Sequence, residues 1–191
     1  AGGSYSADPD LVGKLREQIL AAMDIEMTTP QANMESVELM RIGYDEIDAN
    51  PDGISLSGPM IEAGKLAGQI DREHLSNINS KAAKFGREQL AETHGSIAAL
   101  YWITTPANTR TDQIEAGRQY VRANLQANKI GLSMHPMSQS LQEYKEVAPQ
   151  YKAVHKLLGA QKSERVQMLA RIGHGPDIGP SPRWPLKSRL L

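Results

Sequence analysis

The sequence predicts an α+β fold in which helices are packed around a small sheet. Two short runs, Ile97–Thr104 and Val166–Ile172, have the length and the largely apolar composition of strands. A third extended piece is expected at Leu132–Gln139, because His135 precedes a proline and therefore avoids the α-helical region. Around these segments apolar residues recur at helical spacing, which favours a mixture of helices and a small sheet.

Length and composition restrict the classes of protein to which the chain can belong. Its 191 residues suit one domain of ordinary size, and a hydrophobic content of 40% is enough for a core. The net charge is −1, from 21 basic and 22 acidic residues, so no nucleic-acid-binding surface is expected. No apolar run approaches the ~20 residues that a membrane helix needs. Without cysteine the chain has no disulfide and no thiol nucleophile, and its compartment is left open.

The first half of the chain is predicted to be mainly helical. Residues Ala1–Asp8 are expected to form a loose lead-in without the basic and apolar regions of a signal peptide. An amphipathic helix is expected at Pro9–Met27 and a second helix at Pro30–Ile42. Asn-Pro and Asp-Gly predict a turn within Ala49–Pro59, which lacks the alternating oxygen ligands of an EF-hand. Further helices are expected at Met60–Gln69, from Asp71 onward, at Ser80–Thr93 and at Pro149–Leu158.

The clearest single element is a long helix from Thr109 to Ile130. Thr109 and Asp112 have the spacing of a capping box, and Gly131 is the expected C-cap. The residues Ile114, Gly117, Val121 and Leu125 form an apolar stripe, which small and apolar neighbours widen. This pattern predicts a largely buried helix. A glycine in the middle of a helix costs ~1 kcal/mol relative to alanine, and close approach of a neighbouring backbone would explain Gly117.

No catalytic constellation is evident from the residues alone. The five histidines are scattered without the spacing of a metal site, and no glycine-rich phosphate loop follows a strand. Two strand-then-loop exits, Ile130–Gln139 and Ile172–Arg183, place polar groups beyond buried elements, where ligands often bind. Arg183, set between prolines, suits a phosphate or a carboxylate. A surface-bound tail with an ordinary arginine is the simpler interpretation and is favoured by the residues alone.

Several motifs of the chain resemble those of a known family. The segments that carry the similarity are TPANTRTDQIEAGR, GLSMHPMSQSLQEY and RIGHGPDIGPSPRWPL. Together they resemble the C-terminal part of nitroreductase-like flavoproteins, with the greatest similarity to the Acg-like branch, whose members are often described as twin-arginine translocation signal proteins. The segment MRIGYDEIDANPDGISLSGP is similar to the helical lid insertion of that branch, so residues 27–75 are the expected lid.

The resemblance implies a partial nitroreductase-like fold and an FMN site. It implies that residues 1–191 are the second half of a nitroreductase-like domain, with the upstream half absent and one wall of the flavin site present. The backbone of Pro136, Met137, Ser138 and Gln139 would approach the edge of the flavin ring. Arg183 would bind the FMN phosphate, with Trp184 adjacent to it. The upstream flavin loop and an upstream arginine-rich phosphate motif of the family are not found in this sequence.

Three functions follow as alternatives. The first is an FMN-dependent oxidoreductase that uses NAD(P)H and a small-molecule acceptor. No side chain of this chain is assigned a catalytic role in it. The second is a protein that binds and sequesters flavin beneath the lid without turnover, and the third is a non-enzymatic helical interaction module. The resemblance also implies association with the missing half or with a second copy as a dimer. Its compartment would be periplasmic or cytoplasmic, because the family often carries an upstream export signal.

Overall fold

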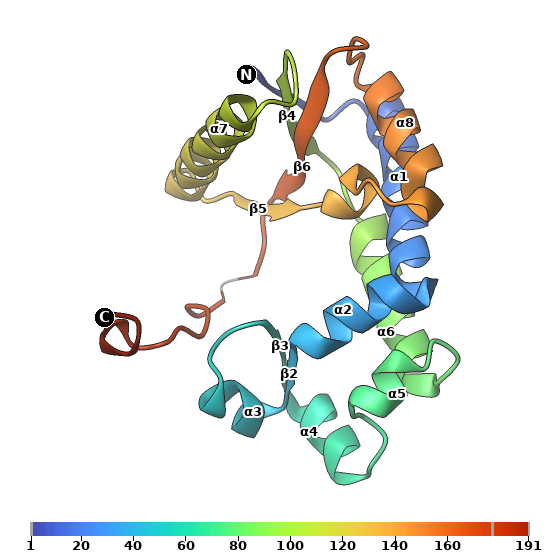
Figure 1. The fold of residues 1–191 in the computed structure, drawn as a ribbon, viewed down its shortest axis with the longest axis vertical. Helices are drawn as coiled ribbons and strands as arrows, with labels where there is room; N and C mark the ends of the chain where they lie inside the picture. Colours follow the sequence, from blue (N-terminus) through green and yellow to red (C-terminus); the bar gives the residue numbers. More distant parts are fainter. Residues whose placement is uncertain (1, 177, 191) are drawn as a thin grey trace. The chain divides into compact units, whose positions relative to one another are not determined.

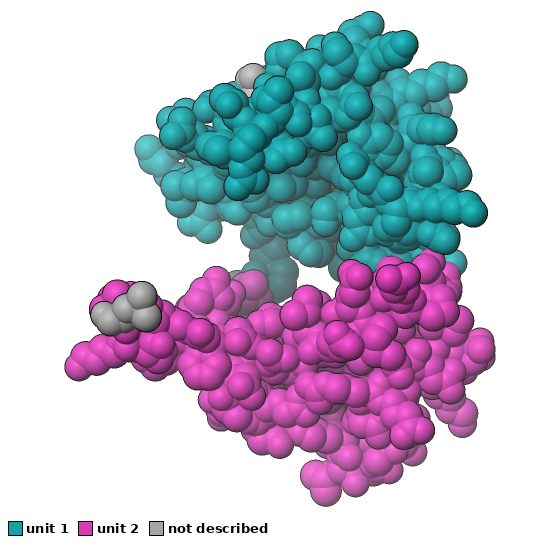
Figure 2. Space-filling model, viewed as in Figure 1, with its two compact units in different colours: residues 1–26, 90–176 teal, residues 27–89, 177–191 magenta. Residues whose placement is uncertain are grey.

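The computed structural model describes residues 2–176 and 178–190, which form two compact units. Unit 1 contains residues 2–26 and 90–176, and unit 2 contains residues 27–89 and 178–190 (Figure 2). The chain passes from one unit to the other within helix α1 (Pro9–Thr28), within helix α6 (Lys81–Gly95), and again after residue 176. The predicted lid, residues 27–75, falls entirely within unit 2.

Unit 1 is built on a four-stranded sheet with the order β1-β4-β6-β5. Its strands are β1 (Gly2–Ser6), β4 (Leu100–Thr105), β5 (Ser133–Pro136) and β6 (Arg165–Gly173), and every neighbouring pair is antiparallel. The three predicted extended segments are therefore confirmed. The prediction of a loose lead-in at Ala1–Asp8 was wrong, because the backbone of this segment pairs with β4. Its residues, GGSYS, show none of the apolar alternation that marks a strand in the sequence.

Helices lie on both sides of this sheet. Figure 1 shows α7 (Arg110–Lys129) on one side and α1 with α8 (Ala148–Leu157) on the other. The core between the sheet and α1 and α8 consists of Val12, Leu15, Ile19, Ile97, Leu100, Met137, Val154 and Leu169. Trp102 is partly buried and packs against this core.

The long helix α7 begins at the predicted cap, but its C-cap is Ile130 rather than the predicted Gly131, and its burial also differs from the prediction. Thr109 accepts a hydrogen bond from the backbone N–H of Asp112, whose side chain accepts one in return, so the capping box is confirmed. The face toward the sheet carries small residues, of which Ala116 and Ala127 are buried. The predicted apolar stripe faces away from the sheet, with Ile114 49%, Val121 56% and Leu125 67% exposed. The prediction of a largely buried helix was therefore wrong within this chain, because Ala116 and Ala127 are the residues of α7 that are buried.

Unit 2 contains short elements. Helices α2 (Pro30–Leu39), α3 (Tyr44–Ala49), α4 (Pro59–Leu66) and α5 (Arg72–Ser76) accompany a parallel pair of strands, β2 (Met40–Ile42) and β3 (Ile54–Leu56). The predicted helix Pro30–Ile42 is therefore too long, since its last three residues pair with β3. The turn expected in Ala49–Pro59 is present around Gly53, whose φ is 66°. A Cβ there would overlap the carbonyl oxygen of Leu39, so a glycine is required.

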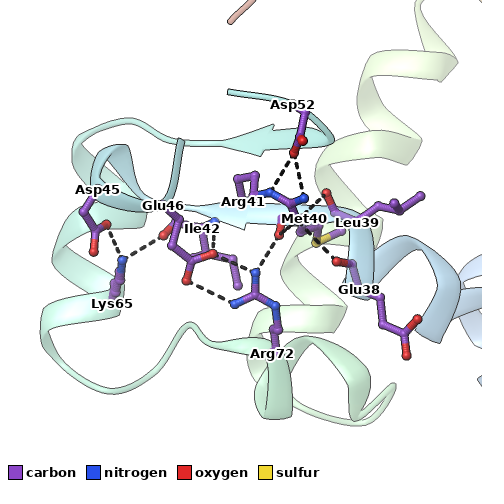
Figure 3. A network of polar contacts seen from close by, with 10 residues as sticks. All are labelled: Glu38, Leu39, Met40, Arg41, Ile42, Asp45, Glu46, Asp52, Lys65 and Arg72. Atoms are coloured by element: carbon purple, nitrogen blue, oxygen red, sulfur yellow. Dashed lines mark hydrogen bonds and ion pairs between the residues drawn. The ribbon is translucent and has the colours of Figure 1, made fainter. Parts of the chain in front are cut away.

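Polar contacts hold the short elements of unit 2 around β2 (Figure 3). Arg72 forms a bidentate pair with Glu46, with N···O distances of 3.1 and 2.7 Å, and also donates to the carbonyl of Met40. Lys65 pairs with Asp45 and donates to the carbonyl of Ile42 at 2.8 Å. These bonds tie α3, α4 and α5 to the backbone of a strand only three residues long. These charge-assisted hydrogen bonds fix the geometry of the short elements around β2.

The capping box predicts the effect of a single substitution. Thr109→Ala removes the side chain that accepts from Asp112 N–H, and we expect it to destabilise the protein by about 1 kcal/mol. Thermal unfolding monitored by circular dichroism measures this loss. Thr111→Ala is the matched control, since Thr111 lies exposed in the first turn of the same helix and should not lower the melting temperature. Equal effects of the two substitutions would contradict the role of the cap.

Candidate functional site

The loop that follows β5 is anchored in the core by one residue. Met137 is 1% exposed, belongs to the apolar core, and donates its backbone N–H to the carbonyl of Leu169 at 2.8 Å. Ser138 is exposed and begins a short 3-10 helix, η1 (Ser138–Leu141). The side chain and the N–H of Met137 are thus both engaged within the protein. Of the predicted loop residues, Ser138 is exposed, whereas Gln139 is half-buried.

Several polar atoms after this loop are buried without a hydrogen-bond partner among the described residues. They include the Oε1 atoms of Gln139, at the end of the loop, and of Gln142, the Oγ of Ser140, a residue with no exposed surface, and the hydroxyl of Tyr144. A buried polar atom without a partner costs free energy, so such atoms mark places where a water or a ligand completes the bonding. The edge of a flavin ring offers one N–H donor and two carbonyl acceptors. The amide oxygens of Gln139 and Gln142 could accept from that N–H, and the hydroxyl of Ser140 could donate to a ring carbonyl.

Strand β5 is held in place by an arginine from the neighbouring strand. Arg171 of β6 donates from Nε to His135 Nδ1 at 3.1 Å and from Nη1 to the carbonyl of Thr93 at 3.0 Å. Arg171 therefore links the last turn of α6 to the edge strand that leads into the Pro136–Gln139 loop. The bond to His135 requires an unprotonated Nδ1. Burial and the charge of Arg171 both lower the pKa of His135, which keeps this nitrogen free to accept.

His94 lies beside this link in the interior of unit 1. It is 3% exposed, its Nδ1 is 3.0 Å from Met23 Sδ, and its ring centroid is 6.1 Å from that of His135. Burial, followed by the charges of Arg171 and His135, lowers the pKa of His94 from 6.5 to about 4. His94 is therefore a neutral core residue at pH 7. The sequence offered no sign of this cluster, because its members come from four separate elements.

The remaining two predicted site residues belong to unit 2. Arg183 is exposed, and its Nη1 donates to the carbonyl of the adjacent Pro182 at 2.9 Å. Trp184 donates its indole N–H to Asp52 Oδ2 at 2.8 Å, and the guanidinium of Arg189 lies 4.7 Å from the centre of its ring. The six predicted residues are thus divided, with Pro136, Met137, Ser138 and Gln139 in unit 1 and Arg183 and Trp184 in unit 2.

Within residues 2–176 and 178–190, no three histidine or acidic side chains are grouped so that they could hold a metal ion. No helix in the same ranges combines the length and the apolar character needed to cross a membrane.

Comparison with known proteins supports the type of fold. The chain is similar to the crystal structure of the FMN- and NADPH-dependent nitroreductase NfnB from Sphigopyxis sp. strain HMH, with 14% sequence identity and a TM-score of 0.51. The superposition covers 99% of this chain and 78% of that chain. No protein-family model and no curated protein matches the sequence. The chain has a nitroreductase-like α+β fold, as the sequence motifs predicted.

The low pKa of His94 predicts a pH-dependent stability. The unfolded imidazole titrates near 6.5, whereas the folded one stays neutral down to about pH 4, so protons bind the unfolded state preferentially between these values. We expect the free energy of unfolding to be constant above pH 7 and to fall by up to about 3 kcal/mol as the pH is lowered through this window. Urea unfolding between pH 7.5 and pH 4.5 measures the slope.

Two histidine variants make this measurement specific. His94→Gln should flatten the fall of stability between pH 6.5 and 4.5, because no imidazole is then buried. His174→Gln should leave the slope as it is in the unaltered protein, since His174 is exposed. If both variants keep the original slope, other groups account for it, such as His135 and His155, whose pKa values burial also lowers, and the assignment to His94 is wrong.

Proposed function

We propose that the chain is an FMN-binding oxidoreductase of the nitroreductase type that provides one wall of the flavin site. The observation that carries this proposal is the loop after β5, where buried amide and hydroxyl oxygens lack partners on a nitroreductase-like fold. The similar solved structure is named as dependent on FMN and NADPH, which supports the same cofactors here. Bound FMN would supply hydride and electron transfer, while the protein supplies orientation and hydrogen bonds.

Each predicted residue then has a physical role. Pro136 and Met137 give the loop its course, Met137 through its buried side chain and its bond to Leu169. Ser138 and Gln139 present polar groups to the ring edge. Arg183 offers an exposed guanidinium whose fork matches phosphate oxygens, whereas Trp184 acts on the tail that carries it. No side chain is assigned as a catalytic acid or base, and NAD(P)H and a small-molecule acceptor are the proposed reactants.

A flavin-sequestering protein is the second candidate. Residues 27–75 form most of unit 2 and are proposed as a lid that restricts access to the ring. A protein that turns yellow with FMN, but whose colour NADPH does not bleach, supports sequestration over turnover. A protein that binds no FMN supports the third candidate, the helical interaction module.

We also infer that a second copy of the chain packs on the α7 stripe, defined as Ile114, Gly117, Val121 and Leu125. Its three large side chains are 49–67% exposed. A Cβ added at Gly117 would meet no described atom within 4 Å, so contacts within the chain do not explain this glycine. A glycine flanked by exposed apolar residues lets a second helix approach closely. Burial of this stripe in a dimer would explain both features of α7.

FMN binding tests the proposed function and the role of Arg183. We expect Arg183→Ala to weaken FMN binding about tenfold or more, because it removes a charge-assisted hydrogen bond to phosphate. Riboflavin, which lacks the phosphate, should bind both proteins equally. Lys187→Ala is the matched control for loss of a positive charge from the same tail. Flavin fluorescence quenching measures all affinities, and an unchanged affinity for FMN in Arg183→Ala removes this residue from the site.

Sedimentation velocity tests the dimer. Val121→Glu places a charge at the centre of the α7 stripe and should shift the protein from dimer to monomer without loss of helix content. Gln126→Glu adds the same charge elsewhere on the exposed surface of α7 and should remain dimeric. A monomeric unaltered protein, or a dimer that survives Val121→Glu, excludes the stripe as the interface. Native mass spectrometry identifies a different partner, such as a second polypeptide, if one is present.

A further inference from the structure

The C-terminal tail, residues 178–190, carries few buried apolar groups. Ile178 is 80% exposed, Leu186 is 73% exposed and Leu190 is 66% exposed. Burial of apolar surface therefore contributes little to holding this segment in place. Trp184 is the large apolar side chain of the tail that is partly buried. Its polar contact with unit 2 becomes the main candidate for an anchor.

The anchor is the side-chain carboxylate of Asp52, which Arg41 also binds. Asp52 Oδ1 accepts two hydrogen bonds from Arg41, at 3.0 Å from Nε and 2.7 Å from Nη2 (Figure 3). This leaves Oδ2 to accept the indole N–H of Trp184 at 2.8 Å. Because both oxygens are engaged, the carboxylate has a defined orientation.

The backbone fixes the position of Asp52 as well. It directly precedes Gly53, whose positive φ and close approach to the carbonyl of Leu39 set the course of the turn before β3. Arg41 lies in β2, in register with Ser55 of β3. Asp52 is therefore held between a strand and a turn whose conformation admits only glycine at the next position.

The fixed position of Trp184 also restricts where Arg183 can lie. Arg183 is bonded directly to Trp184, and the prolines at 182 and 185 restrict the backbone on both sides. Arg189 covers the ring of Trp184 at 4.7 Å, which adds a cation–π contact. The local charge, with Arg41, Arg183 and Arg189 against Asp52, is positive, so an oxyanion is favoured beside the tail.

We propose that Asp52 is a positioning residue, which holds the tail through Trp184 and thereby orients the guanidinium of Arg183 toward an oxyanion. The oxyanion is the FMN phosphate, and this part of the inference rests on the proposed function. Asp52 itself does not touch the ligand. Its effect is confined to the geometry of the tail, so a loss of Asp52 should affect phosphate-bearing ligands alone.

The first measurement follows the tail directly. In a Trp102→Phe background, Trp184 is the one remaining tryptophan. We expect Asp52→Ala to shift the emission of Trp184 to longer wavelength and to increase trypsin cleavage at Arg183 and Lys187 severalfold. Asp48→Ala, which removes another exposed acid from unit 2, should change neither. Unchanged emission and cleavage in Asp52→Ala show that Asp52 does not hold the tail and overturn the proposal.

The second measurement compares FMN with riboflavin. Asp52→Ala should weaken FMN binding about tenfold and leave riboflavin binding unchanged. Trp184→Phe should do the same, because it removes the N–H donor and keeps the Asp52–Arg41 pair, so a misfolded Asp52 variant does not confuse the result. A freed tail with unchanged FMN affinity overturns the positioning role while the proposed function stands. Failure of the unaltered protein to bind either flavin overturns the proposed function and, with it, the role of Arg183 toward phosphate. In that case the emission of Trp184 and the trypsin cleavage still decide whether Asp52 holds the tail.

Discussion

Unit 1 depends on the pairing of β6 with a strand on each side. β6 joins β4, which packs against α1, to β5, which leads into the candidate loop. Leu169, at the middle of β6, places its side chain in the core and gives its carbonyl to the N–H of Met137. Packing and hydrogen bonding thus converge on one residue. A one-residue shift in the register of β6 would turn its apolar side chains to the other face of the sheet and displace the loop.

Much of this arrangement follows from local sequence signals. The caps of α7, the extended segment before Pro136 and the apolar runs of β4 and β6 each depend on neighbouring residues, so they could be predicted. β1 could not, because its residues Gly2–Ser6 are paired only through their backbone. The strand ending of the predicted helix Pro30–Ile42 likewise depends on β3 and on the polar contacts of unit 2. Contacts between distant segments decided each of these errors.

In the candidate site, too, some residues could be predicted from local sequence and others could not. The loop Pro136–Gln139 and the tail residue Arg183 were reached through motifs, whereas the supporting contacts of Arg171 and Asp52 join residues far apart in the chain. Such contacts cannot be predicted from the local sequence, since an arginine or an aspartate on the surface has many ordinary roles. Exposed ion pairs contribute little to stability individually. Those that also bond to backbone carbonyls, as Arg72 and Lys65 do, fix geometry as well.

The outer position of β1 has a consequence for the behaviour of the protein in concentrated solution. One edge of β1 pairs with β4, and its other edge offers backbone N–H and C=O groups to whatever approaches. Natural edge strands are protected against aggregation by lysine, proline or a bulge. The five residues of β1 include no lysine and no proline, and Tyr5 is 79% exposed on it. Among the described residues, this edge of β1 therefore stays open to pairing with a further strand.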